Sequence, residues 1–533
     1  FETCLLLSKR LDKKYNKQTI AAKMTDVPGH TRSIIDPMYD AGIRLLHVGI
    51  NSACPLPSVP TFCRWRSPSG NDLLLVYQKD YGEDEVLPDG KTVVSINFTG
   101  DNHGPHSYER VKKIYADLRK RYPQAQLVGA SFNDVARELL LIKKDLPVVT
   151  SEIGDTWIFG YGGAPIRMAK FRAVSRLYSQ WLNEGKIKKD SDVALDFAAE
   201  LGLIAEHTQG VDVKTHLRQW DKYDMDKFLK GRSEGVFSMA EASWKEIDNY
   251  IDSAIAFLPA SLQKEAREVV AEVDKVKLED NSKMKPMARK RWEQPIAGGM
   301  ILAGLSYQMF DGDDYDDFQN RYLRARYEWA LDDLGKRGLK ESHAVSVTLY
   351  AQTMAQSVRK EKKGTRIITE LRFPENEKVD KRVYPERIQV NCFTTKNGKR
   401  SEVALTVYGK PTVRLPESYW LSFTVPGIES VIAEKMGERV DLMDVVEKGN
   451  RQMHGIDRYV DLITSGETIR ISSKEAFLLN VGEAQGLNYS TNYPDKHKGV
   501  HFNLNNNLWG TNFSMWNEGS LTYHFVIETL NHK

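Results

Sequence analysis

The period of the hydrophobic positions changes twice along the chain. Up to about residue 190, short apolar runs alternate with amphipathic segments, which is typical of parallel strands joined by helices. A helical period then dominates, and from about residue 343 short alternating runs predict antiparallel strands. We therefore expect a multidomain chain with a β/α part at residues 1–165, a helical bundle at 166–340 and an antiparallel β-sandwich at 341–533.

The expected strands of the first part are short apolar runs. They lie at residues 19–24, 43–50, 93–98, 127–129 and 147–150. Between the third and fourth runs, Val111, Ile114 and Leu118 follow the helical period, and Pro123 ends this pattern.

The later parts also carry local signals. Residues 171–181 and 244–255 each present an apolar helix face, and Asp311 with the acidic residues after it predicts a helix N-terminus. Residues 345–349 are expected to form a strand. The final strand is predicted to bury alternate residues, which are Leu521, Tyr523, Phe525 and Ile527.

Composition and charge narrow the functional classes. The 533 residues are 41% hydrophobic and 28% charged, which is ordinary for a globular protein of three or four structural units. The 75 basic and 72 acidic residues nearly balance, so we expect no nucleic-acid partner. No apolar stretch approaches the ~18 residues of a membrane span, so we expect no membrane partner. The motifs HExxH, GxSxG and GxGxxG are absent, which leaves zincin, α/β-hydrolase and Rossmann functions without support.

Three of the expected strands of the first part run into aspartates, namely Asp26, Asp101 and Asp155. Each one alone is equally well explained as a helix N-cap. Three of them at successive strand ends favour a shared acidic site, because chemistry in β/α folds sits at the carboxyl ends of the strands. Two carboxylates at one site are what glycoside hydrolysis needs, so a carbohydrate is the expected substrate.

Several segments resemble the glycoside hydrolase family 38 α-mannosidases. Residues 24–31 (MTDVPGHT) resemble the family's Asp-Pro-Phe-Gly-His-Ser block, residues 100–103 its Gly-Asp-Asp-Phe segment, and residues 206–210 its His-His-Asp-Ala block. The chain is most similar to a poorly characterised group of family-38-like hydrolases, with which it shares residues 154–157, 498–504 and 509–513. The resemblance implies a β/α barrel, a helical bundle and β-sandwich domains.

The resemblance also implies a zinc-dependent, retaining exo-α-glycosidase of α-mannosidase type that acts on a glycan or oligosaccharide. Asp26 would be the nucleophile and a zinc ligand, and His207 a second zinc ligand. Zinc would hold vicinal sugar hydroxyls and support charge near the anomeric carbon. The family's acid/base position is Asn102 here, and an amide cannot protonate a leaving group at neutral pH. We therefore expect Asp101 to be the acid, with Asp155 as the alternative.

Other residues near the expected site are assigned to substrate binding. They are His30, Asn51, Trp65, His103, Asp155, Trp157 and Tyr161. His30 is expected to orient the loop of Asp26 through hydrogen bonds. Trp157 is expected to stack on a sugar, although burial in a core explains this residue equally well.

Two zinc ligands fall short of the three that catalytic zinc sites usually take from the protein. In the family the other ligands come from a His-x-Asp on an earlier strand, and none of the 12 histidines here has an Asp two residues later. The chain opens at Phe1 without an initiator Met or a leader. We therefore expect an N-terminal segment that completes the barrel and the zinc site, either in a longer chain or as a separate fragment.

Two alternatives remain open. A metal-dependent polysaccharide deacetylase would use a similar barrel with Asp and His ligands, but without a covalent glycosyl intermediate. A catalytically inactive sugar-binding homologue is suggested by Asn102. The sugar, the linkage, the compartment and the formation of a homo-oligomer are left open by the sequence.

Overall fold

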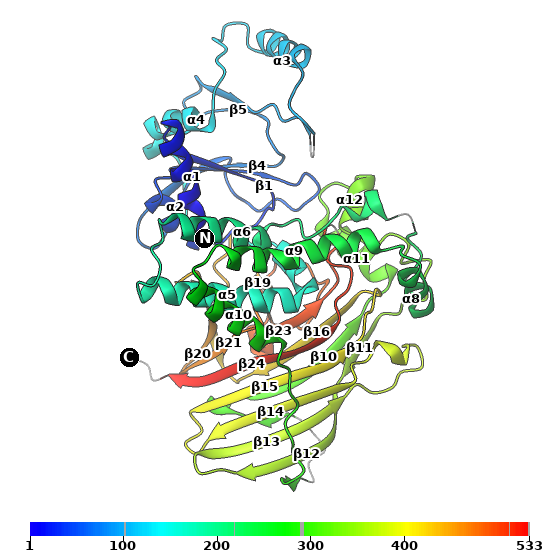
Figure 1. Cartoon of the computed structure of the whole chain (residues 1–533). Helices are drawn as coiled ribbons and strands as arrows, with labels where there is room; N and C mark the ends of the chain where they lie inside the picture. The colour runs from blue at the N-terminus through cyan, green and yellow to red at the C-terminus, as the bar shows by residue number, and fades with distance from the viewer. Residues whose placement is uncertain (101–102, 218, 288–292, 511, 531–533) are drawn as a thin grey trace. The chain divides into compact units, whose positions relative to one another are not determined.

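The computed structural model describes residues 1–100, 103–217, 219–287, 293–510 and 512–530 (Figure 1). The chain divides into two compact units, which are described separately. Unit 1 comprises Phe1–Ile153 with Val446–Lys448, and unit 2 comprises Gly154–Val445 with Gly449–Lys533. In the part of the chain that is described, no helix combines the length and the apolar character needed to cross a membrane.

Unit 1 is built on a sheet with the strand order β1-β2-β4-β3-β7. The strands are β1 (Ala21–Asp26), β2 (Leu45–Ile50), β3 (Phe62–Arg66), β4 (Asp72–Gln78) and β7 (Val148–Val149). β1, β2 and β4 run parallel, β3 pairs antiparallel with β4, and β7 pairs parallel with β3. β2 and β4 are buried along their whole length, which is why their sequences are almost continuously apolar.

The helices described in unit 1 are α1 (Glu2–Tyr15), α2 (Ile35–Asp40), α3 (Tyr108–Arg121) and α4 (Phe132–Leu141). α2 and α4 pack against the sheet and α1 packs against α2, whereas α3 is linked through the ion pair of Arg121 with Asp84. α4 buries Ala136 and Leu139 against Leu45 of β2 and Leu74 of β4. α3 is the helix predicted before Pro123, and it begins at Ser107, whose hydroxyl accepts a hydrogen bond from the Arg110 N–H.

The strand prediction for this part was correct in some places and wrong in others. The runs at 19–24, 43–50 and 147–150 contain β1, β2 and β7, whereas residues 127–129 form no strand, and Val128 is 70% exposed. The run at 93–98 gives only β6 (Val93–Ser95), which pairs antiparallel with β5 (Asp84–Val86) in a separate ribbon. Among the described residues the sheet is therefore open, and the barrel implied by the resemblance is not closed.

Unit 2 begins with a layer of helices. They are α5 (Pro165–Asn183), α6 (Asp192–Gly202), α7 (Val213–His216), α8 (Met225–Ser233), α9 (Ser238–Ala256), α10 (Ala260–Asp274), α11 (Gly312–Tyr322) and α12 (Glu328–Asp333). α5 and α9 contain the two predicted helix faces, and buried residues such as Trp181 and Ile255 share one core with Trp420 of the sheet beneath. α11 begins at the predicted Asp311, whose carboxylate accepts hydrogen bonds from the N–H groups of Asp313 and Asp314.

Two antiparallel sheets form the rest of unit 2, as predicted for the last part, although three of their strands (β8, β9 and β10) lie within the range 166–340 that was predicted to be helical (Figure 1). The first contains β9 (Gln294–Pro295), β10 (Ile301–Met309), β11 (Val347–Tyr350), β16 (Glu417–Thr424), β19 (Met453–Gly455), β22 (Leu478–Val481) and β23 (Val500–Asn506). The second contains β8 (Lys285–Pro286), β12 (Gln352–Lys360), β13 (Gly364–Arg372), β14 (Arg387–Thr395), β15 (Arg400–Lys410), β17 (Ile428–Lys435), β18 (Glu438–Asp441), β20 (Tyr459–Thr464), β21 (Thr468–Ser473) and β24 (Gly519–Leu530).

The two sheets pack face to face through aromatic side chains. Phe525 of β24 lies with its ring centroid 5.4 Å from that of Phe423 and 5.1 Å from that of Phe502. The alternate residues predicted for the final strand are all buried, with Leu521 5% and Ile527 0% exposed. The alternation of apolar residues in this strand therefore follows from its having one face buried against the other sheet.

Candidate functional site

In unit 1, the predicted nucleophile Asp26 is the last residue of β1 and has an unusual backbone. Its φ is 87°, in the region that residues other than glycine seldom adopt. The neighbouring strand β2 ends opposite it, and Asn51 follows that strand with its N–H 2.8 Å from the Asp26 carbonyl oxygen. A strained residue at the carboxyl edge of a parallel sheet is a frequent feature of functional sites.

Within unit 1, Asn51 and Tyr81 both bind the Asp26 carboxylate. The Asn51 amide Nδ2 donates to Asp26 Oδ1 over 3.0 Å, and the Asn51 Oδ1 accepts from the Ala53 N–H over 3.0 Å, so the amide has a fixed orientation. The Tyr81 hydroxyl donates to the same oxygen of Asp26. The structure therefore brings the predicted residues Asp26 and Asn51 together and adds Tyr81, which the sequence prediction missed.

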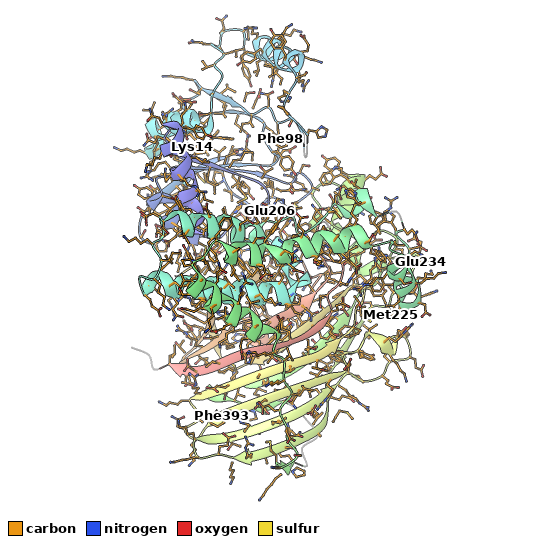
Figure 2. The ribbon with its side chains drawn as sticks, viewed as in Figure 1. Lys14, Phe98, Glu206, Met225, Glu234 and Phe393 are labelled. Atoms are coloured by element: carbon orange, nitrogen blue, oxygen red, sulfur yellow. The ribbon has the colours of Figure 1, made fainter. Side chains whose placement is uncertain are left out.

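Tyr81 can approach Asp26 because the residue of β2 that lies against the Tyr81 backbone is a glycine and has no side chain. A Cβ atom on Gly49 of β2 would lie 2.8 Å from the Tyr81 Cα, so only glycine allows this approach. Lys23 of β1 donates to the Tyr81 carbonyl oxygen over 3.1 Å, and Phe98 packs edge-on against the Tyr81 ring at 5.2 Å (Phe98 is labelled in Figure 2). The position of Tyr81 just after β4 is the one signal that points to it in the sequence.

The loop that follows Asp26 is anchored in the core of unit 1. Pro28 accepts a hydrogen bond of 2.7 Å from the Tyr77 hydroxyl, and His30 exchanges backbone hydrogen bonds with Ile153. Burial lowers the pKa of His30 to about 4, against an opposing interaction with the Val27 carbonyl, so the imidazole is neutral near pH 7. His30 thus belongs to the anchored part of the loop, and its role in orienting Asp26 stays a prediction.

The remaining predicted residues of unit 1 are not joined to this group by the described contacts. Trp65 lies in β3 with no exposed surface and donates its indole N–H to the Ser151 carbonyl oxygen, so it is a core residue. His103 is exposed, with its ring next to Gly100. Asp101, the predicted acid, and Asn102 lie outside the described residues.

In unit 2, Asp155 and Trp157 form a hydrogen-bonded group with Tyr322 of α11. Asp155 Oδ2 accepts from the Trp157 N–H over 2.9 Å, and Asp155 Oδ1 accepts from the Tyr322 hydroxyl over 3.0 Å. The Trp157 indole donates in turn to the Tyr322 oxygen over 2.9 Å. Burial raises the pKa of Asp155 to about 6, although the backbone N–H groups of Trp157 and Thr156 and the Tyr322 hydroxyl lower it. With this pKa, part of the Asp155 carboxyl is protonated in weakly acidic solution and could donate a proton.

Aromatic rings surround this group. The Trp157 ring centroid lies 5.8 Å from that of His207 and 5.8 Å from that of Trp509. Tyr322 adds an edge contact of 5.9 Å with Trp509. Trp157 is 3% exposed, so in this structure it is packed rather than presented as an open platform.

His207, the second predicted zinc ligand, lies in the loop after η4 (Leu203–Ala205). Its Nδ1 is 2.5 Å from the Glu206 carboxylate, and this interaction lowers the pKa of Glu206 (Glu206 is labelled in Figure 2). The Tyr161 hydroxyl donates to the carbonyl oxygens of Ala205 and Glu206 over 2.7 and 3.0 Å. Tyr161 thus holds the backbone of the histidine loop, and its predicted contact with substrate stays a prediction.

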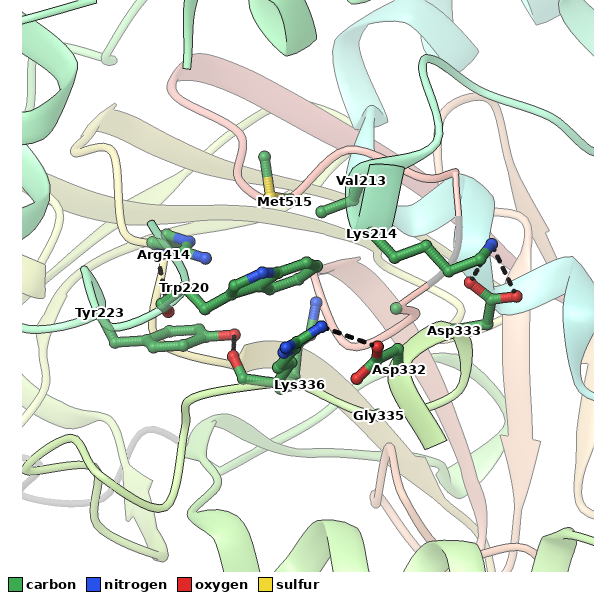
Figure 3. A pocket seen from close by; sticks show the side chains of 12 residues that line it. Val213, Lys214, Trp220, Tyr223, Asp332, Asp333, Gly335, Lys336, Arg414 and Met515 are labelled. Atoms are coloured by element: carbon green, nitrogen blue, oxygen red, sulfur yellow. Dashed lines mark hydrogen bonds and ion pairs between the residues drawn. The ribbon is translucent and has the colours of Figure 1, made fainter. Parts of the chain in front are cut away.

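Residues that line the pocket in Figure 3 hold the backbone at Trp509 in place. Lys336 Nζ donates to the Trp509 carbonyl oxygen over 3.2 Å, and a Cβ on Gly510 would lie 2.4 Å from the carbonyl oxygens of Asp333 and Gly335. Figure 3 also shows the ion pair of Lys214 with Asp333, whose nearest atoms are 2.9 Å apart. Burial, together with the charge of Arg414, lowers the pKa of Lys336 to about 7.

The predicted zinc ligands belong to different units. Within the described residues, no group of three or more His, Cys, Asp or Glu side chains could hold a metal ion. The partners of Asp26 within unit 1 include an amide and a phenol, and those of His207 within unit 2 include Glu206 and the Trp157 ring. These residues do not by themselves fit a zinc ion, so no chemical step is assigned to one.

The chain was compared with protein families and with solved structures. Residues 162–296 match the family described as Domain of unknown function (DUF5054). The structure is similar to that of an α-mannosidase from Enterococcus faecalis V583, with a TM-score of 0.51, 10% sequence identity, and coverage of 99% of this chain and 76% of that chain. It also matches a protein in the glycosyl hydrolase family 38 from Enterococcus faecalis with a TM-score of 0.46, 10% identity, and coverage of 99% and 75%.

No curated protein matches the sequence. The first structural likeness shows that the chain has a fold similar to that of an α-mannosidase, in agreement with the α-mannosidase resemblance of the sequence. At 10% identity this likeness concerns the fold alone, and the narrower resemblance to the poorly characterised group stays a prediction.

Proposed function

We propose that the chain is a glycoside hydrolase of α-mannosidase type, a retaining exo-α-glycosidase, with Asp26 as its nucleophile. The observation that carries the proposal is the Asp26 carboxylate, held by Asn51 and Tyr81 on a strained residue at the carboxyl end of β1. The fold similarity to an α-mannosidase supports the class of reaction.

In the proposed reaction, a carboxylate oxygen of Asp26 attacks the anomeric carbon while the bond to the leaving oxygen breaks. An acid protonates that oxygen, and water then releases the sugar with retained configuration. Asn51 and Tyr81 restrain the rotation of the carboxylate, which keeps the attacking group aligned and lowers the entropic cost of the step.

The proton donor in this proposal is Asp101, with Asp155 as the alternative. The raised pKa of Asp155 suits a general acid, since a useful fraction of the carboxyl stays protonated in weakly acidic solution. The two are separated by the pH profile, because loss of the general acid's proton produces the alkaline limb. That limb should keep its shape in Asp155→Asn, but not in Asp101→Asn, if Asp101 is the acid. Zinc remains part of the proposal only with ligands beyond the two named here, and elemental analysis of the purified protein tests it.

The experiment is a panel of 4-nitrophenyl α-glycosides measured with four proteins. Asp26→Asn keeps the shape of the side chain, and asparagine tolerates a positive φ, so the fold should persist while kcat/KM falls by at least about 10³-fold. Tyr81→Phe should lose roughly tenfold through one hydrogen bond. Asp40→Asn, at an exposed position at the end of α2, is the matched control and should retain full activity.

Three outcomes would contradict the proposal. Turnover that persists in Asp26→Asn would assign the chemistry to another residue. Saccharide binding without turnover, unchanged by Asp26→Asn, would favour the sugar-binding alternative, and release of acetate from acetylated polysaccharides would favour the deacetylase.

A further inference from the structure

Unit 2 contains a polar cavity on the seven-stranded sheet, and the residues of the Asp155 group do not line it. Its volume is about 440 Å³, within the range of roughly 300–1,000 Å³ typical of small-molecule sites. Its lining includes Ser306 of β10, Tyr350 of β11, Ser422 of β16 and His501 of β23, together with Glu483 and Lys498 at the ends of adjacent strands. His501 and Lys498 belong to the segment 498–504, which the resemblance singled out and the proposed reaction does not use.

His501 is the feature that points to a ligand. It is 7% exposed, and its Nδ1 lies 2.8 Å from the Ser422 hydroxyl, which is its partner in the register of β16 and β23. The other ring nitrogen, Nε2, is buried and makes no hydrogen bond of good geometry, although the Gly482 backbone, which also lines the cavity, interacts with the His501 ring and raises its pKa against the larger lowering by burial. Leaving a buried polar atom without a good partner is unfavourable, so a ligand hydroxyl that reached Nε2 would gain a hydrogen bond there.

The lining around His501 is rigid and mixed in charge. Gln308 donates to the Ala484 carbonyl oxygen over 2.7 Å and accepts from the Trp420 indole over 2.9 Å, so its amide is fixed. Lys498 and Glu483 form an ion pair of 2.7 Å in which both side chains are about half exposed. Because Glu483 offsets the charge of Lys498, the cavity offers an anion no excess positive charge.

An aromatic side chain stands at the rim. Tyr350 ends β11, pairs in register with Ser306 and is 68% exposed. A flat exposed ring beside hydroxyl, amide and imidazole groups is suited to a ring-shaped ligand with one apolar face and many hydroxyls. Since a sugar hydroxyl can both donate and accept, it pairs with His501 Nε2 in either tautomer.

We propose that this cavity is a non-catalytic saccharide-binding site, in which Tyr350 stacks on a sugar ring and His501 Nε2 takes a hydrogen bond with a sugar hydroxyl. The site belongs to the sandwich of unit 2 and involves none of the residues assigned to glycoside hydrolysis. It would hold a neutral saccharide on this sheet whether or not the chain cleaves one.

The test is saturation-transfer NMR of the full chain with methyl α-D-mannopyranoside, methyl α-D-glucopyranoside and methyl α-D-galactopyranoside, each titrated to obtain a Kd. Tyr350→Ala should weaken binding of at least one glycoside by about fivefold or more, whereas Tyr350→Phe keeps the ring and should bind like the wild type. His501→Phe should also weaken binding. The matched control is Tyr108→Ala, which removes a ring that is 74% exposed in unit 1 and should change nothing.

Asp26→Asn separates this proposal from the proposed function. Binding that depends on Tyr350 and survives Asp26→Asn supports the sandwich site, even if the chain hydrolyses no glycoside. Binding that is lost in Asp26→Asn and unaffected by Tyr350→Ala overturns the sandwich site and leaves the proposed function intact. The absence of any glycoside binding at tens of millimolar also overturns it.

Discussion

Replacing Asp155 by Asn should change the pH dependence of stability. The folded protein raises the pKa of Asp155 from its ordinary value of 3.8 to about 6, chiefly through burial. Between these two values the folded state binds more protons than the unfolded state, so the free energy of unfolding falls as the pH rises. The loss is complete above about pH 6 and absent below about pH 4, which is the sign expected for an acid with a raised pKa.

The size of the effect follows from the pKa difference. At about 1.4 kcal/mol for each pKa step, the rise from 3.8 to about 6 corresponds to roughly 3 kcal/mol. Asparagine does not titrate, and it can still accept the Trp157 N–H hydrogen bond. Relative to the wild type, Asp155→Asn should therefore gain up to roughly 3 kcal/mol between pH 4 and pH 7.

The assay is urea denaturation at both pH values followed by tryptophan fluorescence, to which Trp157 contributes as one of 10 tryptophans. Asp190→Asn, at an exposed position before α6, controls for the loss of one carboxylate. If Asp155→Asn were less stable than the wild type by a larger margin at pH 7 than at pH 4, the folded state would favour the carboxylate. The reasoning, and with it the suitability of Asp155 as a proton donor, would then be refuted.

Three further predictions concern single side chains. Lys336→Met should stabilise unit 2 more at pH 6.5 than at pH 10, because the folded state lowers the pKa of Lys336 from 10.5 to about 7 and so disfavours the charged amine. The cost that the variant removes is up to roughly 5 kcal/mol at pH 6.5 and much less at pH 10, and thermal shifts at the two pH values check this. Asp26→Gly should relieve backbone strain and raise the unfolding free energy by about 1 kcal/mol while abolishing turnover, as denaturation and glycoside assays would show. Gly49→Ala should displace Tyr81 and lower kcat/KM by roughly tenfold without touching Asp26, and equal activity in this variant would remove Tyr81 from the site.

Local patterns predicted much of the fold. The period of the apolar residues identified β2, α9 and β24, because each element buries one face or its whole length against a core. The missed strands β3 and β4 form an antiparallel pair, whereas the pattern of the first part predicts parallel strands separated by helices. The strand predicted at 127–129 is wrong because Val128 packs against no hydrophobic core and is exposed.

The candidate site was less predictable for a physical reason. Asp26 and Asn51 follow adjacent parallel strands, so their proximity is built into the register and can be inferred from strand order. Tyr81 and Tyr322 come from distant parts of the chain, Tyr322 bonding to Asp155 from 167 positions away, and no local pattern marks such a contact. The sequence prediction therefore found acidic residues but not the hydroxyl groups that hold them.

The measurement that tests the central claim most directly is covalent trapping of the nucleophile. The chain is incubated with a fluorinated α-mannosyl fluoride, a mechanism-based probe that leaves a stable glycosyl ester on a nucleophilic carboxylate, and is then digested with trypsin. Cleavage after Lys23 and Arg32 releases residues 24–32, in which Asp26 is the one side-chain carboxylate. The account predicts that this peptide carries the added sugar mass and that Asp26→Asn abolishes the label. Hydrolysis of glycosides accompanied by a label on another peptide would contradict it.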